Sequence, residues 1–153
     1  MSKKFLVCID SDGCAFDTME IKHKECFCPA YINYFGLQAV SKYARDAWDF
    51  ANLYSSYRGI HRLLSLLKSL DVLADRKEVK ERNFTPPAME ELRAYVAAGK
   101  PLSNAGLEAY LAEHPESEDA ESIKKALCAI GESATVSLGE GKLYNDTLAL
   151  SNE

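Results

Sequence analysis

The first strong pattern in the chain is a short apolar run that ends abruptly at acidic residues. Phe5-Leu6-Val7-Cys8-Ile9 follows two lysines and leads directly into Asp10-Ser11-Asp12-Gly13. An apolar run of this length, closed by a turn signal, predicts a buried β-strand over residues 5–9. Side chains two residues apart lie on the same face of a strand, so Asp10 and Asp12 should project to one side if the extended geometry continues.

After Thr18 the spacing of apolar positions changes from that of a strand to that of a helix. The pattern predicts helices over roughly 18–36, 37–54, 60–72, 85–99, 103–114 and 117–131. The clearest apolar stripe, at i, i+3, i+4 and i+7 spacing, consists of Val40, Tyr43, Ala44, Ala47, Ala51 and Tyr54. Gly36 is expected to end the first helix. A single strand among helices poses a difficulty, because the backbone groups of a strand need partners.

Composition narrows the class of protein. The chain has 153 residues, of which 47% are hydrophobic, enough for one domain with a core. A net charge of −5 argues against non-specific nucleic-acid binding. No apolar run approaches the roughly 18 residues that a membrane span requires. The five cysteines are an odd number without a secretory signal, which predicts reduced thiols and a cytoplasmic location.

The acidic end of the apolar run resembles motif I of the haloacid dehalogenase (HAD) superfamily, an apolar strand followed by Asp-x-Asp-Gly-(Thr/Val)-Leu-x-Asp. Asp10, Asp12, Gly13 and Asp17 match this motif, whereas residues 14–16 depart from it. The resemblance implies that Asp10 is a nucleophile that becomes an aspartyl-phosphate and that Asp12 is the general acid/base. It also implies Mg²⁺ bound by the Asp10 carboxylate and the Asp12 carbonyl. Gly13 would let a substrate approach the backbone closely.

The same resemblance implies an α/β, HAD-like fold dominated by helices. Residues 1–17 would hold the core strand and motif I, residues 18–132 a helical cap of the C1 type, and residues 133–153 a tail that starts the returning core. The later core motifs are not found after Gly131, because Lys142 and Asp146 lack apolar strands before them. Most of the Rossmann-like core is therefore expected to be missing, either because the chain is a fragment or because it is a small protein that uses the motif otherwise.

Further candidate residues lie in the helical region. Arg58 stands near an expected helix start and is predicted to bind a substrate phosphate or carboxylate; a solvated arginine is the alternative. His61 could carry a proton, but lone histidines are more often structural. Cys26-Phe27-Cys28 has no second cysteine pair and makes an incomplete zinc site, so two small buried side chains are the better interpretation.

Two functions of different classes follow from these observations. The first is a Mg²⁺-dependent, HAD-like phosphohydrolase, or a truncated portion of one, that acts on a small phosphorylated metabolite and has weak or no activity as this chain alone. The alternative is a non-catalytic helical interaction module, a detached cap that self-associates or binds a missing core segment. A third option is a metal-binding regulator that uses Asp10 and Asp12 without turnover.

Overall fold

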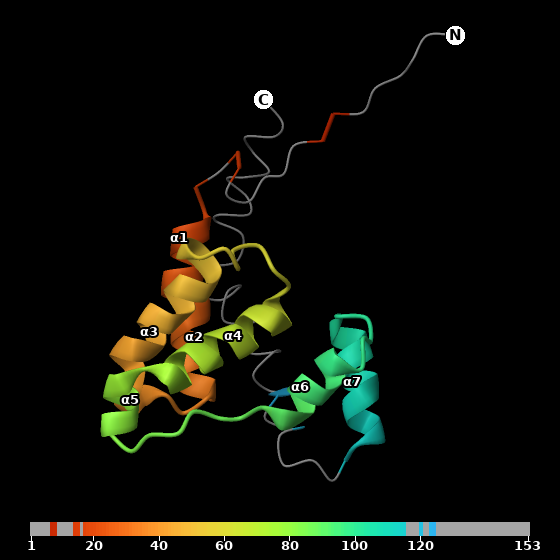
Figure 1. The fold of residues 1–153 in the computed structure, drawn as a ribbon. Helices are drawn as coiled ribbons and strands as arrows, with labels where there is room; N and C mark the ends of the chain where they lie inside the picture. The colour runs from red at the N-terminus through yellow and green to blue at the C-terminus, as the bar shows by residue number, and fades with distance from the viewer. Residues whose placement is uncertain (1–6, 9–13, 16, 116–119, 121–122, 125–153) are drawn as a thin grey trace.

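The expected α/β fold class is wrong, because the structure is helical. The computed structural model describes residues 7–8, 14–15, 17–115, 120 and 123–124, and no β-strand occurs among them (Figure 1). Of the expected strand over residues 5–9, only Val7 and Cys8 belong to the described part; both are exposed, Val7 at 81%. A strand needs a second strand to accept its hydrogen bonds, and the described residues contain none.

The first long helix runs from Met19 to Tyr34 and has a wider, π-helical segment in its middle. Its parts are α1 (Met19–Ile21), a π-helical segment (Lys22–Phe27) and α2 (Cys28–Tyr34). The backbone keeps right-handed helical angles through both junctions, and the Cys28 amide donates to the His23 carbonyl five residues back. Pro29 has no amide to donate, and its ring crowds the carbonyl four residues before it. The wider turn accommodates this proline without ending the helix.

Glycine ends this helix as the sequence predicts. Gly36 has a φ of +65°, the left-handed conformation that a residue without a Cβ adopts at little cost. The Leu37 amide donates to the Ile32 carbonyl at 2.9 Å, and the Gly36 amide donates to the Asn33 carbonyl at 3.4 Å. This pair of bonds is a Schellman motif, which turns Leu37 into the core.

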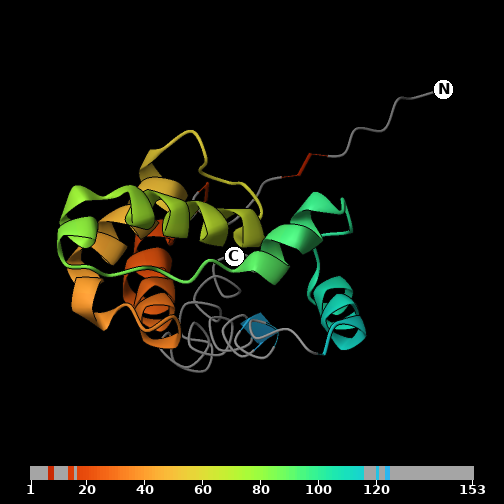
Figure 2. The same ribbon diagram turned by 60° about the horizontal axis from the view of Figure 1, so that its bottom comes forward.

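The remaining helices form two neighbouring groups. They are a 3₁₀ turn (Gln38–Val40), α3 (Ser41–Asp49), a π-helical segment (Phe50–Tyr54), α4 (Arg62–Asp75), α5 (Lys77–Glu81), α6 (Glu90–Ala97) and α7 (Asn104–Glu113). α3 packs against both α2 and α4. Figures 1 and 2 show α6 and α7 as a pair beside this group, reached from α5 by an extended segment. The helix expected over 85–99 begins later than predicted, because Pro86 and Pro87 lie in that segment.

The apolar stripe predicted over residues 37–54 is confirmed along most of its length. Val40, Ala44, Ala47 and Ala51 are fully buried in the structure. Tyr54 is an exception, because this side chain is 60% exposed although the periodicity places it inward. The π-helical segment that precedes Ser55 explains the difference: a wider turn rotates later side chains away from the face that a 3.6-residue period predicts.

Two residues shape the α6–α7 pair: Ser103 caps the start of α7, and Gly106 allows the two helices to pack closely. The Ser103 hydroxyl accepts a hydrogen bond from the Gly106 amide at 3.0 Å, which confirms the predicted helix start. Gly106 packs where a side chain would collide: a Cβ there would lie 2.6 Å from the Tyr95 hydroxyl oxygen and 2.9 Å from the Pro101 carbonyl oxygen. Glycine at this position lets α7 approach α6 closely.

One core joins residues of α2, α3, α4, α5, α6 and α7 with residues outside these helices. Its largest fully buried members are Tyr31, Leu37, Leu63, Leu66, Leu70, Leu73, Met89, Leu92, Tyr95, Leu107 and Ile123. Ile123 confirms one expectation for the helix predicted over 117–131, in which this side chain faces inward. Most of that predicted helix and the whole predicted tail, 133–153, lie outside the described residues.

Candidate functional site

The residues predicted to carry phosphatase chemistry fall mostly outside the described part of the chain. Asp10, Asp12 and Gly13 are not among the described residues, so the predicted magnesium centre stays a prediction. Arg58 is described and exposed, in the turn before α4, and its amide donates to the Ser55 carbonyl at 3.1 Å. α4 begins only at Arg62, so the expected helix start beside Arg58 is wrong. Substrate binding by Arg58 stays a prediction.

The cysteine pair behaves as buried apolar side chains. Cys26 and Cys28 are both buried, and burial raises the pKa of the Cys28 thiol to about 12. Burial also raises the pKa of Cys26. Metal ligation needs the thiolate, which these surroundings disfavour. In the part of the chain that the structure describes, no three histidine, cysteine or acidic side chains gather as metal ligands would.

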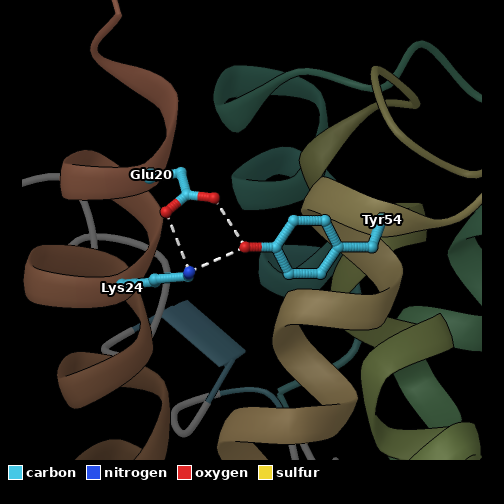
Figure 3. A network of polar contacts seen from close by, with 3 residues as sticks. All are labelled: Glu20, Lys24 and Tyr54. Carbon is cyan, nitrogen blue, oxygen red and sulfur yellow. Dashed lines mark hydrogen bonds and ion pairs between the residues drawn. The ribbon is translucent and has the colours of Figure 1, made fainter.

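A closed network of three polar side chains links the first helix to the end of the second. Lys24 donates to Glu20 at 2.9 Å and to the Tyr54 hydroxyl at 2.7 Å. The Tyr54 hydroxyl in turn donates to the second Glu20 carboxylate oxygen at 2.6 Å. Figure 3 shows the three groups converging from α1, the following π-helical segment and the segment Phe50–Tyr54. We call this network, Glu20, Lys24 and Tyr54, the clasp.

At neutral pH, Lys24 in the clasp is positively charged and Glu20 is negatively charged. The hydrogen bond with Tyr54, and then that with Glu20, raises the pKa of Lys24 above its ordinary range. Hydrogen bonds from Tyr54 and Lys24 lower the pKa of Glu20. General acid–base catalysis works best with a pKa near the working pH, and a nucleophilic lysine must lose its proton. The clasp therefore suits a structural or binding role and not proton transfer.

Exposed apolar side chains lie in the same helical segments as the clasp residues. Tyr54 itself is 60% exposed, and Phe50, one turn earlier in the same π-helical segment, is 44% exposed. Ile21, which follows Glu20 in the chain, is 43% exposed. We call Ile21, Phe50 and Tyr54, together with Glu20 and Lys24, the clasp patch. Exposed aromatic and aliphatic side chains are enriched on surfaces that bind other proteins.

A second polar network lies inside the protein, under the same π-helical segment. The Asn52 amide donates to the Trp48 carbonyl at 2.9 Å, and its side-chain oxygen accepts from the Ser65 hydroxyl at 2.6 Å. The Ser69 hydroxyl donates to the Ser65 carbonyl at 2.8 Å. Asn52, Ser65 and Ser69 are all buried. Because every bond is internal to α3, Phe50–Tyr54 and α4, this network positions helices and offers no open site.

Sequence reasoning missed the clasp, although half of its signal is local. Glu20 and Lys24 are four residues apart on a helix, in the order that favours an ion pair. Their contact with Tyr54 joins residues 34 positions apart in the chain, and no local pattern indicates such a pair. The exposure of Tyr54 depends on the π-helical segment, which the 3.6-residue period hides.

Comparisons with protein-family models, curated proteins and solved structures found no match for this chain. The HAD resemblance therefore rests on the residues of motif I. Among the described helices, none combines the length and the apolar character that crossing a bilayer requires.

Proposed function

We propose that the chain is a non-catalytic helical interaction module whose clasp patch binds a second copy of the same chain. The observation that carries this proposal is the clasp patch itself, where Ile21, Phe50 and Tyr54 remain substantially exposed beside a network with fixed charges. The helical fold also favours this function over the phosphohydrolase, whose chemistry depends on a strand end.

The charge distribution favours a second copy as the partner. A two-fold interface places the same patch on both sides, so the patch must be complementary to itself. Glu20 and Lys24 present opposite charges one helical turn apart, and an antiparallel pairing sets each against its opposite in the other copy. Residues 17–115 contain equal numbers of basic and acidic side chains, so the body carries no net charge that would repel a copy.

Light scattering after size-exclusion chromatography tests the proposal. The average mass of the wild-type chain should rise with protein concentration toward that of a dimer, because three exposed apolar side chains support only a weak interface. Phe50→Lys places a charge at the patch and should hold the mass at that of a monomer. Tyr34→Lys is the matched control, because Tyr34 is 47% exposed but lies at the opposite end of the first helix.

Two outcomes would contradict the dimer. One is a wild-type mass that stays monomeric at every concentration, and the other is an equal effect of Tyr34→Lys and Phe50→Lys. Circular dichroism of each variant ensures that loss of association is not loss of folding.

Motif I supports a second candidate, the Mg²⁺-dependent phosphohydrolase. Without the Ser/Thr, the Lys and the acidic pair of the later core, most electrostatic stabilisation of the transition state is lost; one missing donor of this kind typically costs about 2.7–4 kcal/mol. Any activity toward an aryl phosphate should therefore be weak, dependent on Mg²⁺ and abolished by Asp10→Asn. Equal rates for wild type and Asp10→Asn would remove this candidate. Calorimetry with Mg²⁺ alone would detect metal binding without turnover.

A further inference from the structure

We propose that the Tyr31 hydroxyl and the Trp48 indole N–H form an internal binding site for ordered water between α2 and α3. The observation that carries this proposal is a pair of buried polar atoms that have no hydrogen-bond partner in the described part of the chain. The site lies within one copy of the chain, so it does not depend on association through the clasp patch.

Both side chains are removed from solvent and touch each other. Tyr31 lies on α2 and is fully buried, and Trp48 lies on α3 and is 4% exposed. The centroids of the two rings are 4.8 Å apart, and their planes meet at 35°. The Tyr31 hydroxyl and the Trp48 Nε1 therefore belong to one region of the interface between α2 and α3. Among the residues that the structure describes, neither atom has a hydrogen-bond partner.

Other buried polar side chains of the protein do have partners. Tyr95 is also fully buried, and its hydroxyl donates to the Pro101 carbonyl. The buried Ser65 hydroxyl donates to the Asn52 side chain. A buried polar group without a partner destabilises the folded state, and ordered water is the usual partner where the protein supplies none. Tyr31 and Trp48 are exceptions that such water explains.

The chemistry of the two groups defines the molecule that fits between them. Burial, and then the neighbouring Cys28 thiol, raise the pKa of Tyr31, so its hydroxyl keeps the proton and can donate it to an acceptor. The Trp48 indole N–H is a donor only. The site therefore requires a hydrogen-bond acceptor. An anion would bring an unpaired charge into the core, which is costly. Water is a neutral acceptor, and buried water typically bonds to about two to four polar groups.

Tyr31→Phe tests the proposal in the full chain, because bound water and an unpaired hydroxyl predict effects of opposite sign. Loss of a hydroxyl that bonds to water should lower the folding equilibrium constant by about 2- to 10-fold, as for other buried hydrogen bonds. Loss of an unpaired buried hydroxyl should raise this constant instead. Urea unfolding followed by circular dichroism measures the change.

Tyr34→Phe is the matched control. Tyr34 lies on the same helix as Tyr31 but is 47% exposed, so its hydroxyl is hydrated in the folded and in the unfolded state. Its removal should leave the folding equilibrium constant unchanged within about 2-fold.

A high-resolution crystal structure of the unmodified full chain provides a second measurement that does not depend on any variant. It should show ordered water within hydrogen-bond distance of the Tyr31 hydroxyl oxygen and of the Trp48 Nε1. Three results would overturn the proposal: a dry site, another group of the protein bonded to these atoms in place of water, or a Tyr31→Phe variant at least as stable as the wild type.

Discussion

Replacing Asn52 with alanine should lower the free energy of unfolding by about 2–4 kcal/mol, because it leaves buried polar groups without partners. The Ser65 hydroxyl would lose its acceptor, and the Trp48 carbonyl would lose the Asn52 amide that now donates to it. The Trp48 carbonyl lies just before the π-helical segment Phe50–Tyr54. Regular i to i+4 backbone hydrogen bonds are interrupted there, so the Asn52 side chain stabilises this turn.

Urea unfolding followed by circular dichroism measures this effect, with an unchanged m-value as the sign that the folded state is intact. Asn33→Ala is the matched control: Asn33 is exposed on α2, and the change should stay within about 0.5 kcal/mol. Adding Ser65→Ala to Asn52→Ala should cost less than the sum of the two single changes, because removing both partners leaves fewer unsatisfied groups. Strict additivity would contradict the hydrogen bond between them.

Replacing Ile123 with alanine should cost about 2–5 kcal/mol, the range for truncating a large aliphatic side chain in a packed core. Ile123 is fully buried and belongs to the same core as residues of α2, α3 and α4. The expected loss is large because the structure makes this residue, which follows α7 in the chain, part of the main core.

Thermal and urea unfolding of Ile123→Ala beside Lys124→Ala provide the comparison. Lys124 is the next residue and is exposed, so its truncation should change stability by no more than about 0.5 kcal/mol. Equal, small effects of the two changes would show that Ile123 does not contribute to the core in solution.

Helix positions and helix ends were largely predictable from the sequence, and the reason is local. The glycine after α2 and the serine before α7 each act through bonds to backbone groups a few residues away, so their effects are visible in a short window. The start of α6 was predicted too early. Its prolines favour a helix start, but they also suit the extended segment that carries the chain from α5 to α6.

The strand and the fold class built on it were mispredicted for a different reason. An apolar run of five residues suits a buried strand or a buried helix equally well by hydrophobicity, and the short length of the run with the turn signal after it decided in favour of the strand. Val7, in the middle of that run, is almost fully exposed. A strand is stabilised by another strand, and the described part of the chain contains none.

By itself, the sequence determined that the body of this protein is helical, where most helices end and which faces turn inward, because periodicity and capping act over one or two turns. Only the tertiary structure decided which distant groups meet: Tyr54 with Glu20 and Lys24, and Asn52 with Ser65. It also decided that Tyr54 stays exposed. The physical reason is that the hydrophobic effect is not directional. The pattern of apolar positions therefore predicts which side chains are buried, but not which residues they contact.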